Sequence, residues 1–209
     1  MEFNDKQVQI IETAERLFAD RGFDGTSVRD IAEEAGINIA MISYYFGSKE
    51  KLMEAIFELR VGSLQGRVET LIKDTSMSPV DKVNMLIDEH IDRVLQKQFF
   101  YRIMVSVQLT NKNPSIIKVA NKIKIRNAEI VSELIKEGQK KGVFKKNIDI
   151  ILMLNTLVGT VSQTMMSKEY YREFNNLLET SDEAFQTLLR RKLSIHIKSL
   201  FKAILTNDK

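Results

Sequence analysis

Apolar residues recur at every third or fourth position along most of the chain, which is the period of an amphipathic α-helix. Two prolines and nine glycines leave little material for turn-rich β-structure. The pattern therefore predicts an all-α protein of about nine helices. These are expected near 5–20, 27–35, 38–46, 48–72, 79–97, 99–110, 114–141, 148–173 and 182–206.

Short polar residues and glycines mark the ends of the first predicted helices. Asn4 or Asp5 is expected to cap the first helix, which ends at Gly22. Ser27 begins the second helix, and Asp30 follows three residues later in the spacing of a capping box. Two short helices joined by a tight turn and packed on a first helix describe a helix-turn-helix.

The short helix near 38–46 has two different faces. At about 100° per residue, Ile42 and Phe46 fall on one face with Ile39 beside them, and this face is expected to be core. The other side carries Ala40, Met41, Ser43 and Tyr44, with Tyr45 at its edge. Small and hydroxyl-bearing side chains around an outward tyrosine suit a helix that enters the major groove of DNA.

Two further helix starts are candidate phosphate contacts. Ser48 and Lys49 combine free backbone N–H groups with one cation, and Ser27 and Arg29 offer the same chemistry at the second helix. The alternative for each position is that the tyrosines are packing residues and Lys49 is a solvated charge.

Composition and charge narrow the class of protein. The chain of 209 residues has no cysteine, its start lacks the layout of a signal peptide, and no apolar run is long enough to cross a membrane. A cytoplasmic protein is therefore expected. The net charge is +3, yet residues 1–50 hold ten acidic and five basic side chains. That balance predicts weak non-specific DNA binding and a shallow dependence on salt, unless Lys6, Lys51 or the N-terminal amine contributes.

The stretch AERLFADRGFDGTSVRDIAEEAGINIAMISYYFGSKEKLMEAIF resembles the DNA-binding region of the tetracycline-repressor (TetR) family. The resemblance lies in AERLFADRGF, in TSVRDIAEEAG and in the YYF-x-SKEKL junction, and it covers about residues 6–57. It implies that the residues contacting DNA are Ser27, Arg29, Asn38, Ala40, Met41, Ser43, Tyr44, Tyr45 and Lys49, with Lys49 as the phosphate anchor. Ile39 and Ser43 depart from the common pattern, which leaves the operator sequence open.

The resemblance also implies a two-domain regulator, with a DNA-binding domain at 1–50 and an effector-binding and dimerisation domain at 51–209. GQKKGVF, at 138–144, resembles the loop before the dimerisation helices of the family. The expected dimer contacts are Leu154, Val158, Val161, Leu189 and Leu200. An apolar effector is expected among Phe99, Phe100, Tyr101, Met104, Val107, Leu134, Phe144 and Met165, although each of these positions is equally consistent with ordinary core.

No motif for catalysis or metal binding stands out. His90 lies near acidic residues, but it does not share a helix face with Asp88 and Asp92, and His196 is isolated. The sequence thus predicts no metal, no cofactor and no enzyme activity. The leading hypothesis is a homodimeric repressor that binds a palindromic operator and is released by a small molecule. Its rivals are a DNA-binding protein without an effector and an all-helical enzyme.

Overall fold

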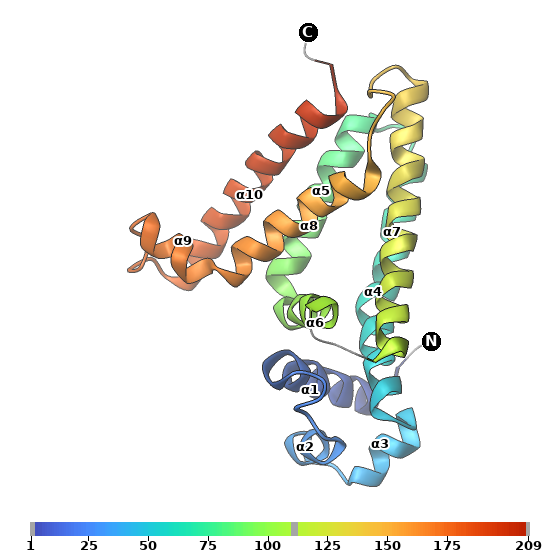
Figure 1. Cartoon of the computed structure of the whole chain (residues 1–209), viewed down its shortest axis with the longest axis vertical. Coiled ribbons are helices and arrows are strands. Elements are labelled where there is room, and N and C mark those ends of the chain that lie inside the picture. The colour runs from blue at the N-terminus through green and yellow to red at the C-terminus, as the bar shows by residue number, and fades with distance from the viewer. Residues whose placement is uncertain (1–2, 110–112, 208–209) are drawn as a thin grey trace. The chain divides into compact units, whose positions relative to one another are not determined.

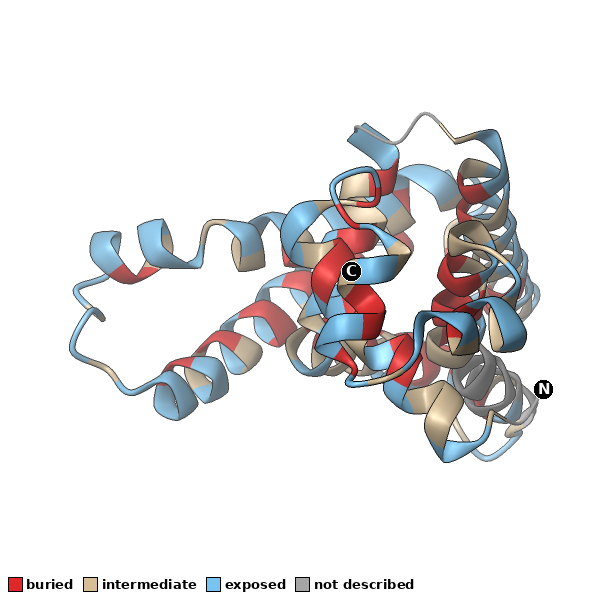
Figure 2. Cartoon of the chain, turned by 90° about the horizontal axis from the view of Figure 1, so that it is seen from below, coloured by how far each residue is buried: buried red, intermediate tan, exposed pale blue. Residues whose placement is uncertain are grey.

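The computed structural model describes residues 3–109 and 113–207 of the chain (Figure 1). Within these residues it contains ten α-helices, α1 to α10, and no β-strand. The all-α prediction is confirmed. In Figure 2 many helices carry buried residues along one side and exposed residues along the other, as expected of amphipathic helices.

The chain forms two compact units. Unit 1 combines Met1–Arg67 with Gln98–Arg126, and unit 2 combines Val68–Lys97 with Asn127–Lys209. The sequence pattern does not predict that 98–126 belongs to the N-terminal unit, because this depends on contacts between residues far apart in the chain. The predicted domain boundary at residue 50 stays a prediction.

Unit 1 is built around the helix-turn-helix. It contains α1 (Asp5–Arg21), α2 (Val28–Glu34), α3 (Ile39–Phe46), the first part of α4 (Lys49–Lys73), α6 (Gln98–Leu109) and the start of α7 (Pro114–Lys140). The first helix packs against α2 and α6, and α2 packs against α3. Phe57 of α4 and Phe100 of α6 meet edge to face in the core, with their ring centroids 5.9 Å apart.

Unit 2 is a bundle around α5 (Pro79–Gln96). It also contains the ends of α4 and α7, together with α8 (Ile150–Met166), α9 (Lys168–Phe174) and α10 (Asp182–Leu205). The fifth helix packs against both α8 and α10. Polar contacts add to this packing: Asp92 on α5 receives two hydrogen bonds from Arg190 on α10, at 2.6 and 2.8 Å.

Local sequence signals set the helix ends as predicted. Asn4 caps α1, Gly22 follows that helix at φ 75°, and Ser27 with Asp30 forms the predicted capping box of α2. The stop after α7 is also confirmed. Gly142 has φ 71°, and Phe144 packs so closely on Gly138 that a Cβ there would lie 2.0 Å from the Phe144 ring.

One predicted helix is wrong. The apolar pattern over 148–173 predicts a single helix, but the chain breaks at Ser167 and forms α8 and α9. Beyond this break the buried Arg172 donates hydrogen bonds to the Thr180 carbonyl and to Asp182, and its guanidinium lies over the Phe185 ring. These contacts with the start of α10 turn the chain back, which a periodic pattern cannot reveal.

Among the described residues, no single helix has both the length and the apolar character to cross a membrane. Only α8 and α9 taken together would satisfy length and composition, and they meet at a bend of 75°.

Candidate nucleic-acid interface

The third helix separates a buried side from an exposed side. Ile42 is completely buried, whereas Tyr44 is 84% exposed and Ala40 and Ser43 are also exposed. Ile39 was expected beside the core but is 48% exposed. The reason is that the neighbouring helices cover only part of α3, so that of its residues Ile42 alone is fully buried. The exposed face therefore consists of Ile39, Ala40, Ser43 and Tyr44.

The three consecutive aromatic residues do not share one environment. Tyr45 and Phe46 are partly buried and pack against the core of unit 1, while Tyr44 points to solvent. The Tyr44 ring meets the Tyr45 ring edge to face, at a centroid distance of 5.1 Å. Tyr45 is thus placed to support Tyr44 from the core side.

The start of α2 is held by its capping box. Asp30 accepts hydrogen bonds from the Ser27 hydroxyl at 2.6 Å and from the Ser27 N–H at 2.7 Å. These hydrogen bonds keep the pKa of Asp30 below its usual value. The hydroxyl of Ser27 is therefore already engaged, and Arg29 is the exposed cation at this helix start.

The start of α3 presents an amide group. Asn38 is exposed, and its Oδ1 accepts a hydrogen bond from the Ala40 N–H at 2.8 Å. That bond fixes the orientation of the side-chain amide and leaves its NH₂ group directed away from the cap. Met41, also expected on the recognition face, is half-buried.

Lys49 is directed into its own unit. Its Nζ donates to the carbonyl oxygens of Phe23 at 2.9 Å and Thr26 at 3.0 Å. The same ammonium lies 4.3 Å from the centroid of the Phe23 ring. The predicted phosphate anchor is therefore already bound to the turn between α1 and α2.

Several acidic residues of the N-terminal segment are paired within unit 1. Arg60 donates to Glu15 at 2.6 and 2.8 Å, and Arg102 donates to Asp20 at 2.9 Å. Both arginines lie outside residues 1–50. The segment 98–126, which belongs to unit 1, holds six basic and no acidic side chains. The charge of residues 1–50 alone is thus a poor guide to the field of this unit.

The expected effector residues do not gather in one unit. Phe99, Phe100, Tyr101, Met104 and Val107 lie in unit 1, whereas Leu134, Phe144 and Met165 lie in unit 2. Phe100 and Val107 are buried in the core of unit 1, and Tyr101 and Met104 pack against it. A cavity inside either unit therefore cannot include all eight residues.

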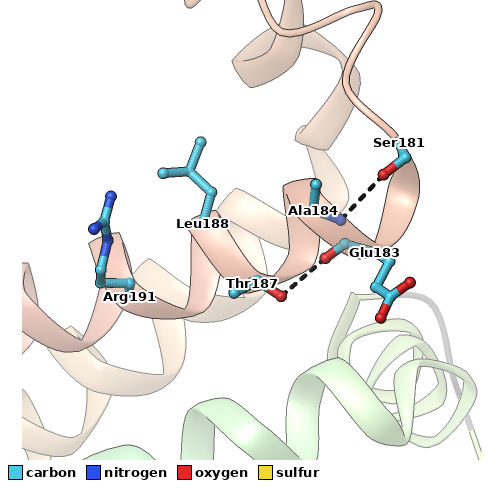
Figure 3. Close-up of a pocket in the computed structure, with 6 residues that line it drawn as sticks. All are labelled: Ser181, Glu183, Ala184, Thr187, Leu188 and Arg191. Carbon is cyan, nitrogen blue, oxygen red and sulfur yellow. Dashed lines mark hydrogen bonds between the residues drawn. The ribbon is translucent and has the colours of Figure 1, made fainter.

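A hollow of about 540 Å³ lies along the N-terminal half of α10, and Figure 3 shows the side chains that line it. Its lining includes Thr187, Leu188 and Arg191. None of its lining residues belongs to the expected effector set. In the described part of the chain, no group of three or more His, Cys, Asp or Glu side chains is placed to hold a metal ion.

The expected dimer residues fall into two groups. Val161 and Leu189 are buried within unit 2, where α5, α8 and α10 pack against one another, and they form intramolecular core. Val158 and Leu200 are exposed, and Leu154 is half-buried. Only this second group is accessible to a partner.

An outward tyrosine on the second helix of a helix-turn-helix, in a chain with a second helical unit, is the arrangement expected of a DNA-binding transcriptional regulator. The model of the family described as "Bacterial regulatory proteins, tetR family" matches residues 10–56. A second model, "YsiA-like protein, C-terminal region", matches residues 57–192. The chain belongs to the TetR family, a class of ligand-responsive repressors.

Relatives of known name agree with this class. The chain is 24% identical over 184 residues to the fatty acid metabolism regulator protein of Bacillus subtilis, covering 88% of this chain and 94% of that protein. It is 28% identical over 167 residues to the transcriptional repressor KstR2 of Mycolicibacterium smegmatis, covering 78% of each. The first is named a regulator protein and the second a transcriptional repressor.

A solved structure shares the fold. FadR from Bacillus subtilis, in complex with stearoyl-CoA, matches with a TM-score of 0.67 and 23% identity, over 92% of this chain and 97% of that one.

Proposed function

We propose that the protein is a homodimeric repressor that reads a palindromic operator through α3 and leaves it when an apolar small molecule binds. The observation that carries the dimer is a second, exposed apolar face on α8. Ile151, Leu152, Val158 and Met166 are all exposed and fall on one side of this helix. Gly159, on the same side, leaves room for close approach. The opposite side is already buried in unit 2.

A stripe of large aliphatic side chains in water marks a contact with another protein surface. On α10 the exposed Ile195 and Leu200 offer similar chemistry. We therefore place the dimer contacts at Leu154, Val158 and Leu200, together with Ile151, Leu152 and Ile195. A symmetric dimer also suits the DNA, because two recognition helices must reach half-sites about 34–36 Å apart or a multiple of that spacing.

The effector we propose is a long-chain acyl thioester. Support comes from the relatives, one named for fatty acid metabolism and one solved with stearoyl-CoA. An acyl chain also fits the apolar chemistry expected from the sequence. The competing ligand class is a steroid, because the solved structure of KstR2 from Mycobacterium tuberculosis is described as that of a ketosteroid transcriptional regulator.

Release requires the ligand to favour a conformer in which the recognition helices no longer fit the operator. We propose that α4 transmits this change, because it begins directly after α3 in unit 1 and ends in unit 2. The protein would act in the cytoplasm, on DNA, without catalysing a reaction.

Fluorescence anisotropy on DNA from upstream of the protein's own coding region tests this proposal. Acyl-CoAs of increasing chain length, free CoA and a steroid thioester are added to the complex, and thermal unfolding is followed in parallel. Long acyl-CoAs should release the DNA and raise the melting temperature. Release by the steroid thioester alone would change the ligand class, and release by none would favour a regulator without an effector.

A further inference from the structure

Close contacts hold the turn between α1 and α2 against the end of α1. The Thr26 hydroxyl, which is buried, donates to the Gly22 carbonyl at 2.9 Å. Gly25 is packed so tightly that a Cβ would lie 2.3 Å from the Arg21 carbonyl oxygen. The Phe23 ring is buried against Phe18, at a centroid distance of 5.3 Å. The turn leads directly into Ser27, the cap of α2.

Lys49 of α4 holds this turn through two donors and through its charge at once. An ammonium has three N–H donors, and Lys49 directs two of them at the carbonyl oxygens of Phe23 and Thr26, the two ends of the turn. The face of the Phe23 ring lies against the same ammonium. A phosphate would have to compete with these partners for the donors of Lys49.

We propose that Lys49 is a positioning residue for DNA binding and not a phosphate ligand. It is the first residue of α4, and α3 ends three residues before it. By holding the turn that precedes α2, Lys49 fixes the start of α2, and with it Arg29, relative to α3. Movement of α4 is thereby passed to both helices of the helix-turn-helix together. This inference rests on the proposed DNA contacts of α2 and α3.

The two roles of Lys49 predict different responses to salt. Loss of a phosphate contact lowers the slope of log affinity against log salt by about 0.9, so by about twice that in a dimer. Loss of a positioning contact lowers the affinity, and it lowers the slope only as far as the phosphate contact of Arg29 is lost with it. In an Arg29→Met background that contact is already absent, so loss of the positioning contact leaves the slope unchanged there.

The experiment compares Lys49→Met with wild type in operator binding at several salt concentrations, well below the melting temperature of each. We expect at least about a tenfold loss of affinity, and no change of slope when the same substitution is made in an Arg29→Met background. Lys82→Met is the matched control, since Lys82 in unit 2 also donates from a buried ammonium, to the Ile72 carbonyl at 2.6 Å and to Glu137 at 3.1 Å. It should lower the melting temperature but not the operator affinity.

A double-mutant cycle with Arg29→Met separates positioning from simple stabilisation. If Lys49 acts by placing Arg29, then Lys49→Met costs less affinity in the Arg29→Met background than in wild type. Additive losses, a slope that Lys49→Met lowers by about 0.9 per subunit in the Arg29→Met background, or an unchanged affinity would each overturn the proposal. Lys49→Arg is the second variant in case Lys49→Met does not fold. It keeps the charge but not the geometry, so it should also weaken binding, whereas a phosphate ligand would tolerate it.

Amide hydrogen exchange without DNA tests the contact independently of function. Lys49→Met should speed exchange over 23–30 and leave unit 2 unchanged. If wild type binds no operator DNA, the proposed function fails, while the exchange result still decides whether Lys49 holds the start of α2.

Discussion

The third and eighth helices are alike in having one buried and one exposed face, but their exposed faces differ in chemistry. On α3 the exposed face carries a hydroxyl, a phenol and the small side chain of Ala40, with Ile39 as its one large aliphatic residue. On α8 the exposed face is dominated by aliphatic side chains, among them Leu152 and Val158. A surface that meets base edges needs hydrogen-bonding groups, whereas a surface that meets its own copy gains most from apolar area. The difference supports the proposed roles, in which α3 contacts DNA and α8 contacts a second copy of the chain.

The largest expected effect concerns the buried side of α3. Ile42→Ala should lower the free energy of unfolding by about 2–5 kcal/mol, because Ile42 is fully buried in the core of unit 1. Urea denaturation measures the change. Ser43→Ala, on the opposite face, is the control and should change stability by no more than about 0.5 kcal/mol. Equal losses in both variants would contradict the division of α3 into two faces.

The proposed dimer interface on the exposed side of α8 is tested by introducing a charged side chain there. Val158→Glu should raise the dissociation constant of the dimer by about a hundredfold or more, since the interface would bury an unpaired carboxylate. Sedimentation velocity over a concentration series gives the result. Ile125→Glu introduces the same change at an exposed residue of α7 and should leave the dimer intact. If the dimer persists in Val158→Glu, the interface does not lie on the exposed side of α8.

The exposed side of α3 is tested by removing its most exposed ring. Tyr44→Ala should weaken operator binding by about 2 kcal/mol or more per dimer, because two half-sites each lose a contact, while stability stays unchanged. Anisotropy titration and thermal unfolding measure the two quantities. Tyr170→Ala removes a similarly exposed tyrosine from α9 and should change neither operator affinity nor stability. A fall in melting temperature with Tyr44→Ala would show that this ring is part of the core.

The smallest expected effect, per pH unit, is a pH dependence of stability that comes from His90 on α5, the helix against which α8 packs. His90 on α5 is buried, and burial, followed by the nearby Arg93 charge, lowers its pKa from 6.5 to about 3. Between these values the unfolded chain binds a proton that the folded chain does not. Stability should therefore fall as the pH drops below about 6.5, by up to about 1.4 kcal/mol per pH unit. Urea denaturation from pH 7 to 4.5 measures this slope, which should be flatter in His90→Leu. An identical slope in the two proteins would rule out His90 as the source.

Much of the local structure could be predicted because its causes lie within a few residues. The capping box of Ser27 and Asp30 and the stop at Gly142 each depend on hydrogen bonds and backbone freedom inside one turn of chain. The opposite placement of Ile42 and Tyr44 follows from helix geometry alone. The family resemblance also rests on one continuous stretch, about residues 6–57, which contains Ser27, Ile42 and Tyr44.

The errors share a different origin. Ile39, placed beside the core by periodicity, is exposed because the neighbouring helices cover only part of α3. The break at Ser167 depends on the contacts of Arg172 with residues of the following loop and helix. Val161 could be assigned to core or to interface by pattern alone, since both environments favour the same aliphatic side chain.

By itself, the sequence determined that this chain is helical, that it begins with a helix-turn-helix, and that Tyr44 faces away from Ile42. These properties follow from the helical period and from capping groups that act over a few residues. Only the tertiary structure decided which apolar residues are left for a partner, that 98–126 belongs with the N-terminal helices, and that the ammonium of Lys49 is bound to the turn before α2. Burial and long-range hydrogen bonds depend on which helices meet, and the spacing of residues along one helix carries no record of that.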